Sequence, residues 1–269
     1  MARTIAIANQ KGGVGKTTTA VNLAASLAVA EQRVLLVDLD PQGNATSAYG
    51  VEKAQLSAHA YHVLVDGLPA HDAIAQTELE GCDILPTNTD LVGAELELVT
   101  GHGRETRLRD ALAPLADGYD LILLDCPPSL GLLTLNGLTA ADGVLIPLQC
   151  EYYAMEGMSH LLRTIDLVKA RLNPGLSLDG IVLTMYDKRN RLTFQVETEV
   201  VNHFGPLVWP TRIPRNVRLS ESPSFGKPAL LYDVAAPGTA AYLALADDLL
   251  ARQPKAPVSS SSSQEVFGQ

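Results

Sequence analysis

The residues best suited to chemistry lie in a glycine-rich segment near the N-terminus, residues 11–18 (KGGVGKTT). An apolar run, residues 5–8, precedes it and an amphipathic stretch, residues 20–30, follows it. A loop between a strand and a helix directs backbone N–H groups and the positive end of the helix dipole toward a phosphate. We expect Lys16 to reach the β- and γ-phosphates of a nucleotide and the Thr17 hydroxyl to bind Mg²⁺.

The loop departs from the strict P-loop pattern at its start. That pattern has a glycine five residues before Gly15, where this chain has Gln10, and a second lysine, Lys11, comes next. The form K-G-G-x-G-K-T-T resembles the deviant Walker A loop of the ParA/MinD/nitrogenase-iron-protein superfamily. The resemblance implies that Lys11 crosses to the nucleotide of a partner subunit, so that two ATP molecules lie between the subunits of a dimer. The alternative for Lys11 alone is a solvated lysine beside an ordinary loop.

Two acidic motifs end apolar runs: residues 34–44 (VLLVDLDPQGN) and 121–128 (LILLDCPP). Carboxylates at the carboxyl edge of parallel strands face the ligand crevice. After this loop, the motifs resemble the superfamily's switch I and its Walker B strand with switch II. The resemblance implies that Asp40 orients and polarises the attacking water, that Asp38 supports the Mg²⁺ shell, and that Asp125 holds Mg²⁺ through a water. Each motif alone would also suit an acidic turn that caps a strand.

A fourth motif occupies residues 214–223 (PRNVRLSESP) and continues through Gly226-Lys227-Pro228. It resembles the P-R-x-x-x-x-E-[AS]-P-x-x-G-[KQ] region of the ParA/Soj family. The resemblance implies that its start lies near the adenine and that its arginines belong to a non-specific DNA surface of the dimer. Residues 184–186 end an expected strand at the same edge, which adds Met185 to the expected base contacts.

The charge distribution agrees with a local DNA surface. The chain has a net charge of −10, yet residues 188–227 carry seven Lys or Arg and three Glu, a net charge of +4. A basic face on an acidic protein can bind phosphate backbones, and phosphate contact is expected rather than base reading. The alternative is a solvated surface or ion pairs within the chain. The expected DNA-binding residues are Lys188, Arg189, Arg191, Arg215, Arg218 and Lys227.

These motifs give a full set of expected site residues. The candidate catalytic residues are Lys11, Lys16 and Asp40. The candidate ATP-binding residues are Lys11, Gly12, Gly13, Val14, Gly15, Lys16, Thr17, Thr18, Met185, Pro214 and Asn216. The candidate Mg²⁺ residues are Thr17, Asp38, Asp40 and Asp125.

Composition and periodicity predict the fold. The chain has 269 residues, of which 46% are hydrophobic and 5% aromatic, so one domain with an aliphatic core is expected. Apolar runs alternate with amphipathic stretches, which predicts a doubly wound α/β fold with a mostly parallel sheet and helices on both faces. The expected strands are 3–9, 33–38, 82–86, 119–125, 143–148, 178–185 and 207–209. The expected helices are 16–30, 90–100, 105–115, 130–140, 153–172, 191–203 and 237–252.

The rest of the chain bounds the interpretation. Residues 50–80 are weakly periodic and predict short peripheral helices, while residues 254–269 predict a disordered Ser-rich tail after an ATPase domain of residues 1–253. No apolar run reaches the roughly 18–20 residues that span a membrane, and no leader is evident. The three cysteines are expected to be reduced and buried, and His59 and His62 to be ordinary histidines rather than metal ligands.

Three other functions are compatible with a nucleotide-binding loop of this form. An electron-transfer ATPase needs cluster-binding cysteines, which residues 87–120 lack. A membrane-cycling ATPase like MinD needs a basic amphipathic C-terminal helix, and this chain has a Ser-rich tail instead. A ParA relative that positions a protein cargo on the nucleoid stays open. The resemblance favours a cytoplasmic, nucleoid-associated ParA-type ATPase whose ATP-bound homodimer binds double-stranded DNA without sequence preference. It implies a ParB-like, centromere-binding partner that stimulates slow hydrolysis, and no membrane contact.

Overall fold

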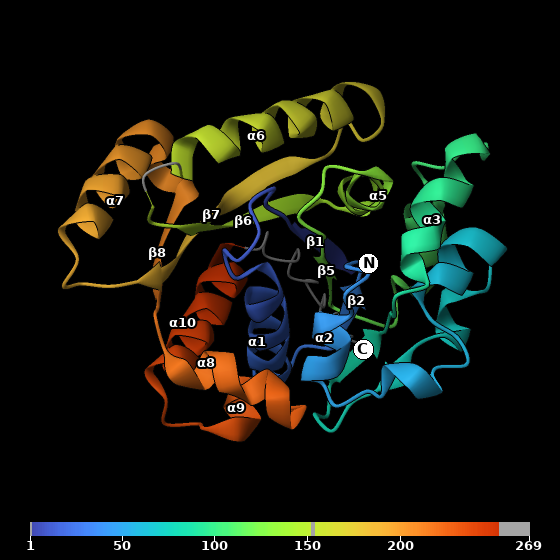
Figure 1. Cartoon of the computed structure of the whole chain (residues 1–269), viewed down its shortest axis with the longest axis horizontal. Coiled ribbons are helices and arrows are strands. Elements are labelled where there is room, and N and C mark those ends of the chain that lie inside the picture. Colours follow the sequence, from blue (N-terminus) through green and yellow to red (C-terminus); the bar gives the residue numbers. More distant parts are fainter. Residues whose placement is uncertain (1, 152–153, 253–269) are drawn as a thin grey trace, which may run out of the picture.

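A single mixed sheet organises the part of the chain that the computed structural model describes, residues 2–151 and 154–252 (Figure 1). Its strand order is β3-β4-β2-β5-β1-β6-β7-β8, and every neighbouring pair is parallel except β3 with β4. The strands are β1 (Arg3–Ile7), β2 (Val34–Asp38), β3 (Ala75–Gln76), β4 (Cys82–Leu85), β5 (Leu121–Asp125), β6 (Gly143–Gln149), β7 (Ser177–Tyr186) and β8 (Val208–Pro214).

Helices cover both faces of this sheet (Figure 1). On one face lie α3 (Leu91–Glu97), α4 (Arg107–Leu112), α5 (Leu132–Ala140), α6 (Ala154–Arg171) and α7 (Arg191–Phe204). On the other lie α1 (Lys16–Val29), α2 (Asn44–Ala48), α8 (Val217–Glu221), α9 (Ala229–Tyr232) and α10 (Pro237–Arg252). The predicted doubly wound α/β fold is therefore confirmed.

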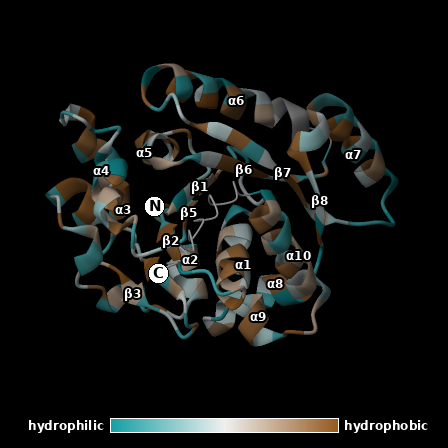
Figure 2. Cartoon of the chain, turned by 180° about the vertical axis from the view of Figure 1, so that it is seen from behind, coloured by the Kyte–Doolittle hydropathy of each residue, from teal (hydrophilic) through white to brown (hydrophobic). Residues whose placement is uncertain are grey.

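Alternation along the strands explains why two layers of helices are needed. In β1, Ile5 and Ile7 belong to the core on the α1 side, whereas Ala6, and Ala8 directly after the strand, belong to the core on the α5 side. Successive side chains of a strand point to opposite faces, so a strand that is apolar at every position must be covered twice. In Figure 2 hydrophobic residues accordingly predominate along the central strands, and hydrophilic residues gather in the peripheral loops.

Most expected elements are present, and the differences have local causes. The last expected strand, 207–209, is longer in the structure, where β8 ends at Pro214. The sequence pattern did not predict this extension, because this edge strand carries the polar residues Thr211 and Arg212. The expected helices 90–100 and 105–115 end in 3₁₀ turns, 98–100 and 113–115. The short elements α2, β3, α8 and α9 were not predicted.

Other expectations concern the periphery. Residues 50–80 form short helical turns at Lys53–Gln55, His62–Asp66 and Ala70–Asp72, as predicted. The predicted tail, residues 254–269, and residue 153 of an expected helix lie outside the described residues. The three cysteines are buried and unpaired. Among the described residues, no helix combines the length and apolar character needed to cross a bilayer.

The central position of β1 determines where a ligand can bind. β1 pairs with β5 on one side and β6 on the other, and the chain leaves it directly toward α1. In open α/β sheets, ligands bind outside the carboxyl ends of the strands at such a switch point. The same edge carries Asp38 at the end of β2 and Asp125 at the end of β5.

Candidate functional site

The glycine-rich loop lies between β1 and α1, as its sequence predicts. Gly13 and Gly15 have positive φ angles of 73° and 87°, which favour glycine because other residues meet steric clashes there. Gly15 is the N-cap of α1; no side chain caps the helix and its first turn has no acidic residue. The backbone dipoles at this helix end are therefore suited to an anion.

Two buried polar side chains fix the shape of this loop. The Thr184 hydroxyl, at the end of β7, donates to the Val14 carbonyl over 2.8 Å. Asn9 donates to the carbonyl of Pro147 in β6 over 2.7 Å and accepts from the Lys11 backbone N–H over 3.0 Å. Sequence reasoning did not single out Asn9, although a polar residue directly after an apolar strand is a usable signal.

The two lysines of the loop differ in their surroundings. Lys16 is only 6% exposed, and its Nζ donates to the Lys11 carbonyl over 3.2 Å. Burial lowers the pKa of Lys16, while the nearby carboxylates of Asp125 and Asp40 raise it. Lys11 is partly exposed and its amine pairs with the carboxylate of Glu151. The structure thus brings Lys16 together with Asp40 and Asp125, but directs Lys11 elsewhere.

Asp125 is the most exceptional carboxylate of the site. It is fully buried, lies in register with Asp38 of β2 and Ile7 of β1, and neither of its oxygens has a hydrogen-bond partner among the described residues. Burial and the charge of Asp38 raise its pKa well above the usual range, and the nearby Thr17 hydroxyl and Lys16 counteract this. An unpartnered buried carboxylate beside a hydroxyl fits a bound cation, because such a charge is otherwise costly.

Asp38 and Asp40 have different partners. One oxygen of Asp38 accepts from the N–H and the hydroxyl of Thr46, at 2.8 and 2.7 Å, and the other accepts from the Asp40 N–H at 3.2 Å. Burial raises the pKa of Asp38 to about 6, and these hydrogen bonds oppose the shift. Asp38 therefore anchors the following loop to α2, whereas the side chain of the half-exposed Asp40 accepts a hydrogen bond from the N–H of Gln42. Thr46 was not predicted as part of the site.

The expected base contacts converge on one cavity. A cavity of about 240 Å³ lies beside Gly15 and is lined by Met185, Pro214 and Asn216, together with Thr18. Met185 has a positive φ of 48°, which is uncommon for a residue other than glycine. The Asn216 side chain caps α8 by accepting from the Arg218 N–H. The cavity continues the P-loop and has room for a planar base.

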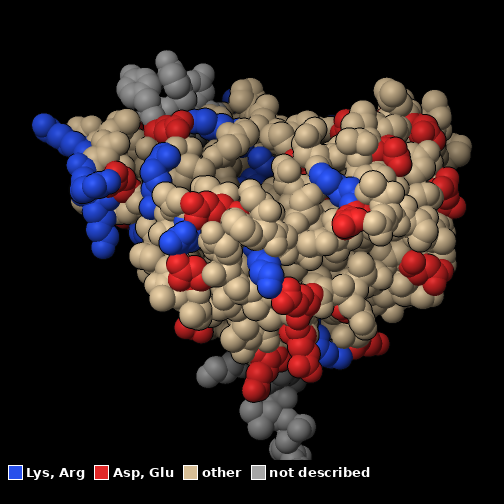
Figure 3. Space-filling model, turned by 60° about the horizontal axis from the view of Figure 1, so that its bottom comes forward, with Lys and Arg blue, Asp and Glu red and all other residues tan. Residues whose placement is uncertain are grey.

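The expected DNA-binding residues flank this cavity in two groups. Lys188, Arg189 and Arg191 lie in the turn after β7 and at the start of α7, and Arg215, Arg218 and Lys227 lie between β8 and α9; all but the partly buried Lys227 are exposed. On the α7 and α8 side of the face in Figure 3 (left), Lys and Arg side chains gather.

Several of these cations already have partners within the chain. Arg218 pairs with Glu221 at 2.9 Å and Asp233 at 3.1 Å, Arg189 with Asp187 at 3.2 Å, and Lys227 with Glu78 at 3.1 Å. Surface pairs of this kind contribute little to stability, because water screens both charges.

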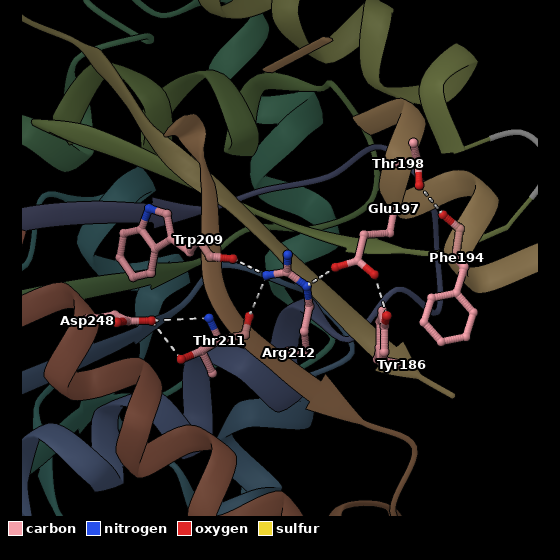
Figure 4. Close-up of polar contacts among 8 residues, drawn as sticks. All are labelled: Tyr186, Phe194, Glu197, Thr198, Trp209, Thr211, Arg212 and Asp248. Atoms are coloured by element: carbon pink, nitrogen blue, oxygen red, sulfur yellow. Dashed lines mark hydrogen bonds and ion pairs between the residues drawn. The ribbon is translucent and has the colours of Figure 1, made fainter. Parts of the chain in front are cut away.

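One arginine of the basic region points inward instead. Arg212 donates to Glu197 of α7 at 2.8 Å and to backbone carbonyls of β8, and Tyr186 donates to the same carboxylate (Figure 4). Thr211 next to it bonds Asp248 of α10 over 2.6 Å. This network fastens α7 and α10 to β8, so Arg212 and Glu197 neutralise each other and add nothing to the surface charge.

Comparisons with known proteins agree with this geometry. Residues 2–178 match the family described as "AAA domain". The chain is 57% identical to "Chromosome partitioning protein ParA" of Myxococcus xanthus, covering 95% of this chain and 90% of that one. It is 55% identical to "Sporulation initiation inhibitor protein Soj" of Bacillus subtilis, covering 93% and 99%. A crystal structure titled cobyrinic acid a,c-diamide synthase from Mycobacterium smegmatis, with bound ATP analogue and magnesium, has 42% identity and a TM-score of 0.82 over 93% of this chain and 95% of that one.

Proposed function

Since the chain belongs to the ParA/Soj family of chromosome-partitioning ATPases, we propose that its ATP-bound dimer binds DNA without sequence preference and that hydrolysis releases it. The observation that carries the proposal is the arrangement at the carboxyl edge of the sheet. There a buried Lys16 faces Asp40 and the unpartnered carboxylate of Asp125, at the end of a helix dipole.

The residues of this edge have separate roles in the proposed hydrolysis. Lys16 and the loop amides hold the β- and γ-phosphates, and Asp40 orients the attacking water. Thr17 and Asp125 would hold Mg²⁺, which would supply positive charge against the phosphates. The protein's part in phosphoryl transfer is mainly positioning and electrostatic stabilisation. The cavity lined by Met185, Pro214 and Asn216 takes the base.

Two features support the proposed dimer and its binding of DNA. Gly12 is exposed, so the loop is accessible to a second subunit, and Lys11 next to it can turn outward by leaving Glu151. The exposed cations beside α7 and α8 suit phosphate backbones. Dimerisation doubles their number.

We also propose a protein partner and a cellular location for the dimer. A ParB-like protein bound at a centromere-like site stimulates the slow hydrolysis, and the dimer resides on the nucleoid in the cytoplasm. The Myxococcus xanthus relative, named as a chromosome partitioning protein, supports this assignment. We propose residues 1–253 as the ATPase domain. A ParA-like ATPase that positions a protein cargo on the nucleoid would use the same dimer and the same nucleoid binding, with a different partner.

The experiment measures ATP hydrolysis, dimerisation and DNA binding together. With ATP and Mg²⁺, the protein should hydrolyse ATP, double its mass by light scattering and shift two unrelated duplexes equally. With ADP it should do neither of the last two. A ParB-like protein with its site should accelerate turnover. ATP turnover that no ParB-like protein accelerates, together with nucleotide-dependent DNA binding, would favour the protein-cargo function, and absence of turnover would refute the assignment.

A further inference from the structure

Two glycines far apart in the sequence meet backbone to backbone beside the site. Gly50 follows α2, and Gly226 follows the 3₁₀ turn Ser222–Phe225. A β-carbon on Gly50 would lie 3.1 Å from the Gly226 carbonyl oxygen, and one on Gly226 would lie 2.8 Å from the Gly50 Cα. Both residues have positive φ angles, 73° and 64°. Only glycines permit so close an approach of two chain segments.

On one side, this contact is tied to the loop that carries the candidate water-orienting residue. Asp38 holds Thr46 in α2 through two hydrogen bonds, and its other oxygen holds the N–H of Asp40. Gly50 closes the same short helix by donating to the Ser47 carbonyl over 3.0 Å. Asp38 is thus a shared anchor for Asp40 and α2, which couples the position of the Asp40 loop to that of α2 and Gly50.

On the other side, the contact is tied to the basic segment, residues 217–227. Gly226 lies directly before Lys227, and the Lys227 N–H donates to the Ser222 carbonyl over 3.3 Å. Arg218 is in α8, which runs without interruption into that turn. A cavity of about 380 Å³ between α1, α2 and the turn leaves room for relative movement.

We propose that Gly50 and Gly226 are positioning residues that transmit γ-phosphate binding at the Asp40 loop to the DNA-binding segment 217–227. This inference rests on the proposed function only in the step that links residues 217–227 to DNA binding. The base cavity also touches this segment, through Leu219 and Ser220, so any nucleotide reaches it by that route. ATP differs from ADP by the γ-phosphate alone. The difference between the two nucleotides thus isolates the route through the glycines.

The test compares Gly50→Ala and Gly226→Ala with a matched control, Gly67→Ala. Gly67 is exposed and has the same φ of 73° as Gly50, but a β-carbon there meets nothing within 4 Å. Hydrogen–deuterium exchange of residues 217–227 is measured with ATP and with ADP, and light scattering reports the dimer fraction in the same samples. Mobility shifts give the ratio of DNA affinities with the two nucleotides.

We expect wild type and Gly67→Ala to show an ATP-specific change in exchange that Gly50→Ala and Gly226→Ala lose, at unchanged ATP affinity. The ATP-to-ADP ratio of DNA affinities should fall by about tenfold, within the range of coupling between two sites. An ATP-specific change that is absent in wild type, persists in both glycine variants, or vanishes in Gly67→Ala as well would overturn the inference. If the exchange results are as expected but no variant binds DNA, the coupling between the two segments is supported and the proposed DNA binding is refuted. If Gly226→Ala does not fold, the results for Gly50→Ala alone test the inference, because Gly50 is exposed.

Discussion

The side-chain amine of Lys11 pairs with the carboxylate of Glu151 in the same chain. Lys11 opens the glycine-rich loop and Glu151 directly follows Cys150 after β6, so the contact joins the carboxyl ends of two adjacent strands. Both side chains are partly exposed, 36% and 43%. In the proposed dimer, Lys11 must leave Glu151 before it can reach a phosphate of the partner subunit. The single chain therefore holds the second lysine in a position that opposes the proposed dimerisation.

Glu151→Gln should strengthen ATP-dependent dimerisation. An exposed ion pair contributes about 0.5 kcal/mol, and two such pairs break in each dimer, so the dimerisation constant should rise roughly fivefold. Light scattering across a protein dilution series with ATP measures it. Glu80→Gln, an exposed carboxylate on another part of the surface, is the control. Weaker or unchanged dimerisation in Glu151→Gln would mean that the pair does not compete with assembly.

Lys16→Ala should abolish ATP binding. Lys16 is buried beside two carboxylates, and without its ammonium Asp40 and Asp125 would repel the phosphates with no positive charge between them. Titration calorimetry with ATP and Mg²⁺ measures the affinity. The control, Lys169→Ala, removes an exposed lysine from the last turn of α6. Unchanged affinity in Lys16→Ala would refute the assignment of the phosphate site.

Asp40→Ala should bind ATP yet barely hydrolyse it. The Asp40 side chain accepts a hydrogen bond from the nearby N–H of Gln42, and its loss leaves the loop anchored by Asp38 and Thr46. Loss of a group that orients and polarises water should lower turnover by about 100-fold or more. The dimer should then persist with ATP, which light scattering over time records. Wild-type turnover in this variant would remove Asp40 from the mechanism.

The sequence predicted those parts of the site that are local in the chain. The loop 11–18 lies between an apolar strand and a helix, and Asp38 and Asp125 end strongly apolar runs, so their positions at the sheet edge follow from periodicity and from the rules of parallel sheets. Their direct pairing in register depends on the strand order, in which β5 separates β1 from β2.

Contacts between distant segments could not be predicted in this way. Thr46 binds Asp38 only because the turn after Asp40 returns the chain to the end of β2. Arg212 looks like a surface cation in the sequence, but Glu197 approaches it from α7. The Gly50–Gly226 contact joins segments that no local pattern relates. Each depends on tertiary packing, which overrides local propensity.

Gly12→Val should bind ATP but stay monomeric. In the single chain a β-carbon on Gly12 meets nothing within 4 Å, so the valine fits the folded monomer. In a dimer whose loops face each other, the branched side chain would hold the subunits apart. Gly12→Ala should give an intermediate dimerisation constant, and thermal melting should match wild type for both. ATP-dependent dimerisation of Gly12→Val at the wild-type level would argue against the proposed arrangement.

Arg218→Glu should abolish DNA binding, and Arg189→Glu should have the same effect more weakly. ATP binding and dimerisation should remain in both variants. Both side chains are exposed, and each reversal replaces attraction by repulsion at the phosphate backbone. Arg218 also pairs with Glu221 and Asp233, so Arg218→Gln, which removes the charge without repelling these acids, should weaken binding in the same direction. Arg33→Glu is the matched control, since Arg33 is an exposed arginine paired with Asp120 at the opposite edge of the sheet.

Mobility shifts with ATP, at several salt concentrations and with two unrelated duplexes, measure these effects. For wild type, log affinity should fall with log salt by about 0.9 for each phosphate contacted, and Arg218→Gln should have a shallower slope because each subunit loses one contact. Affinity should be similar for both duplexes, since phosphate contacts carry no sequence information. Unaltered binding by Arg218→Glu and Arg189→Glu would place the DNA surface elsewhere on the dimer, and a strong preference for one duplex would mean that the protein reads bases.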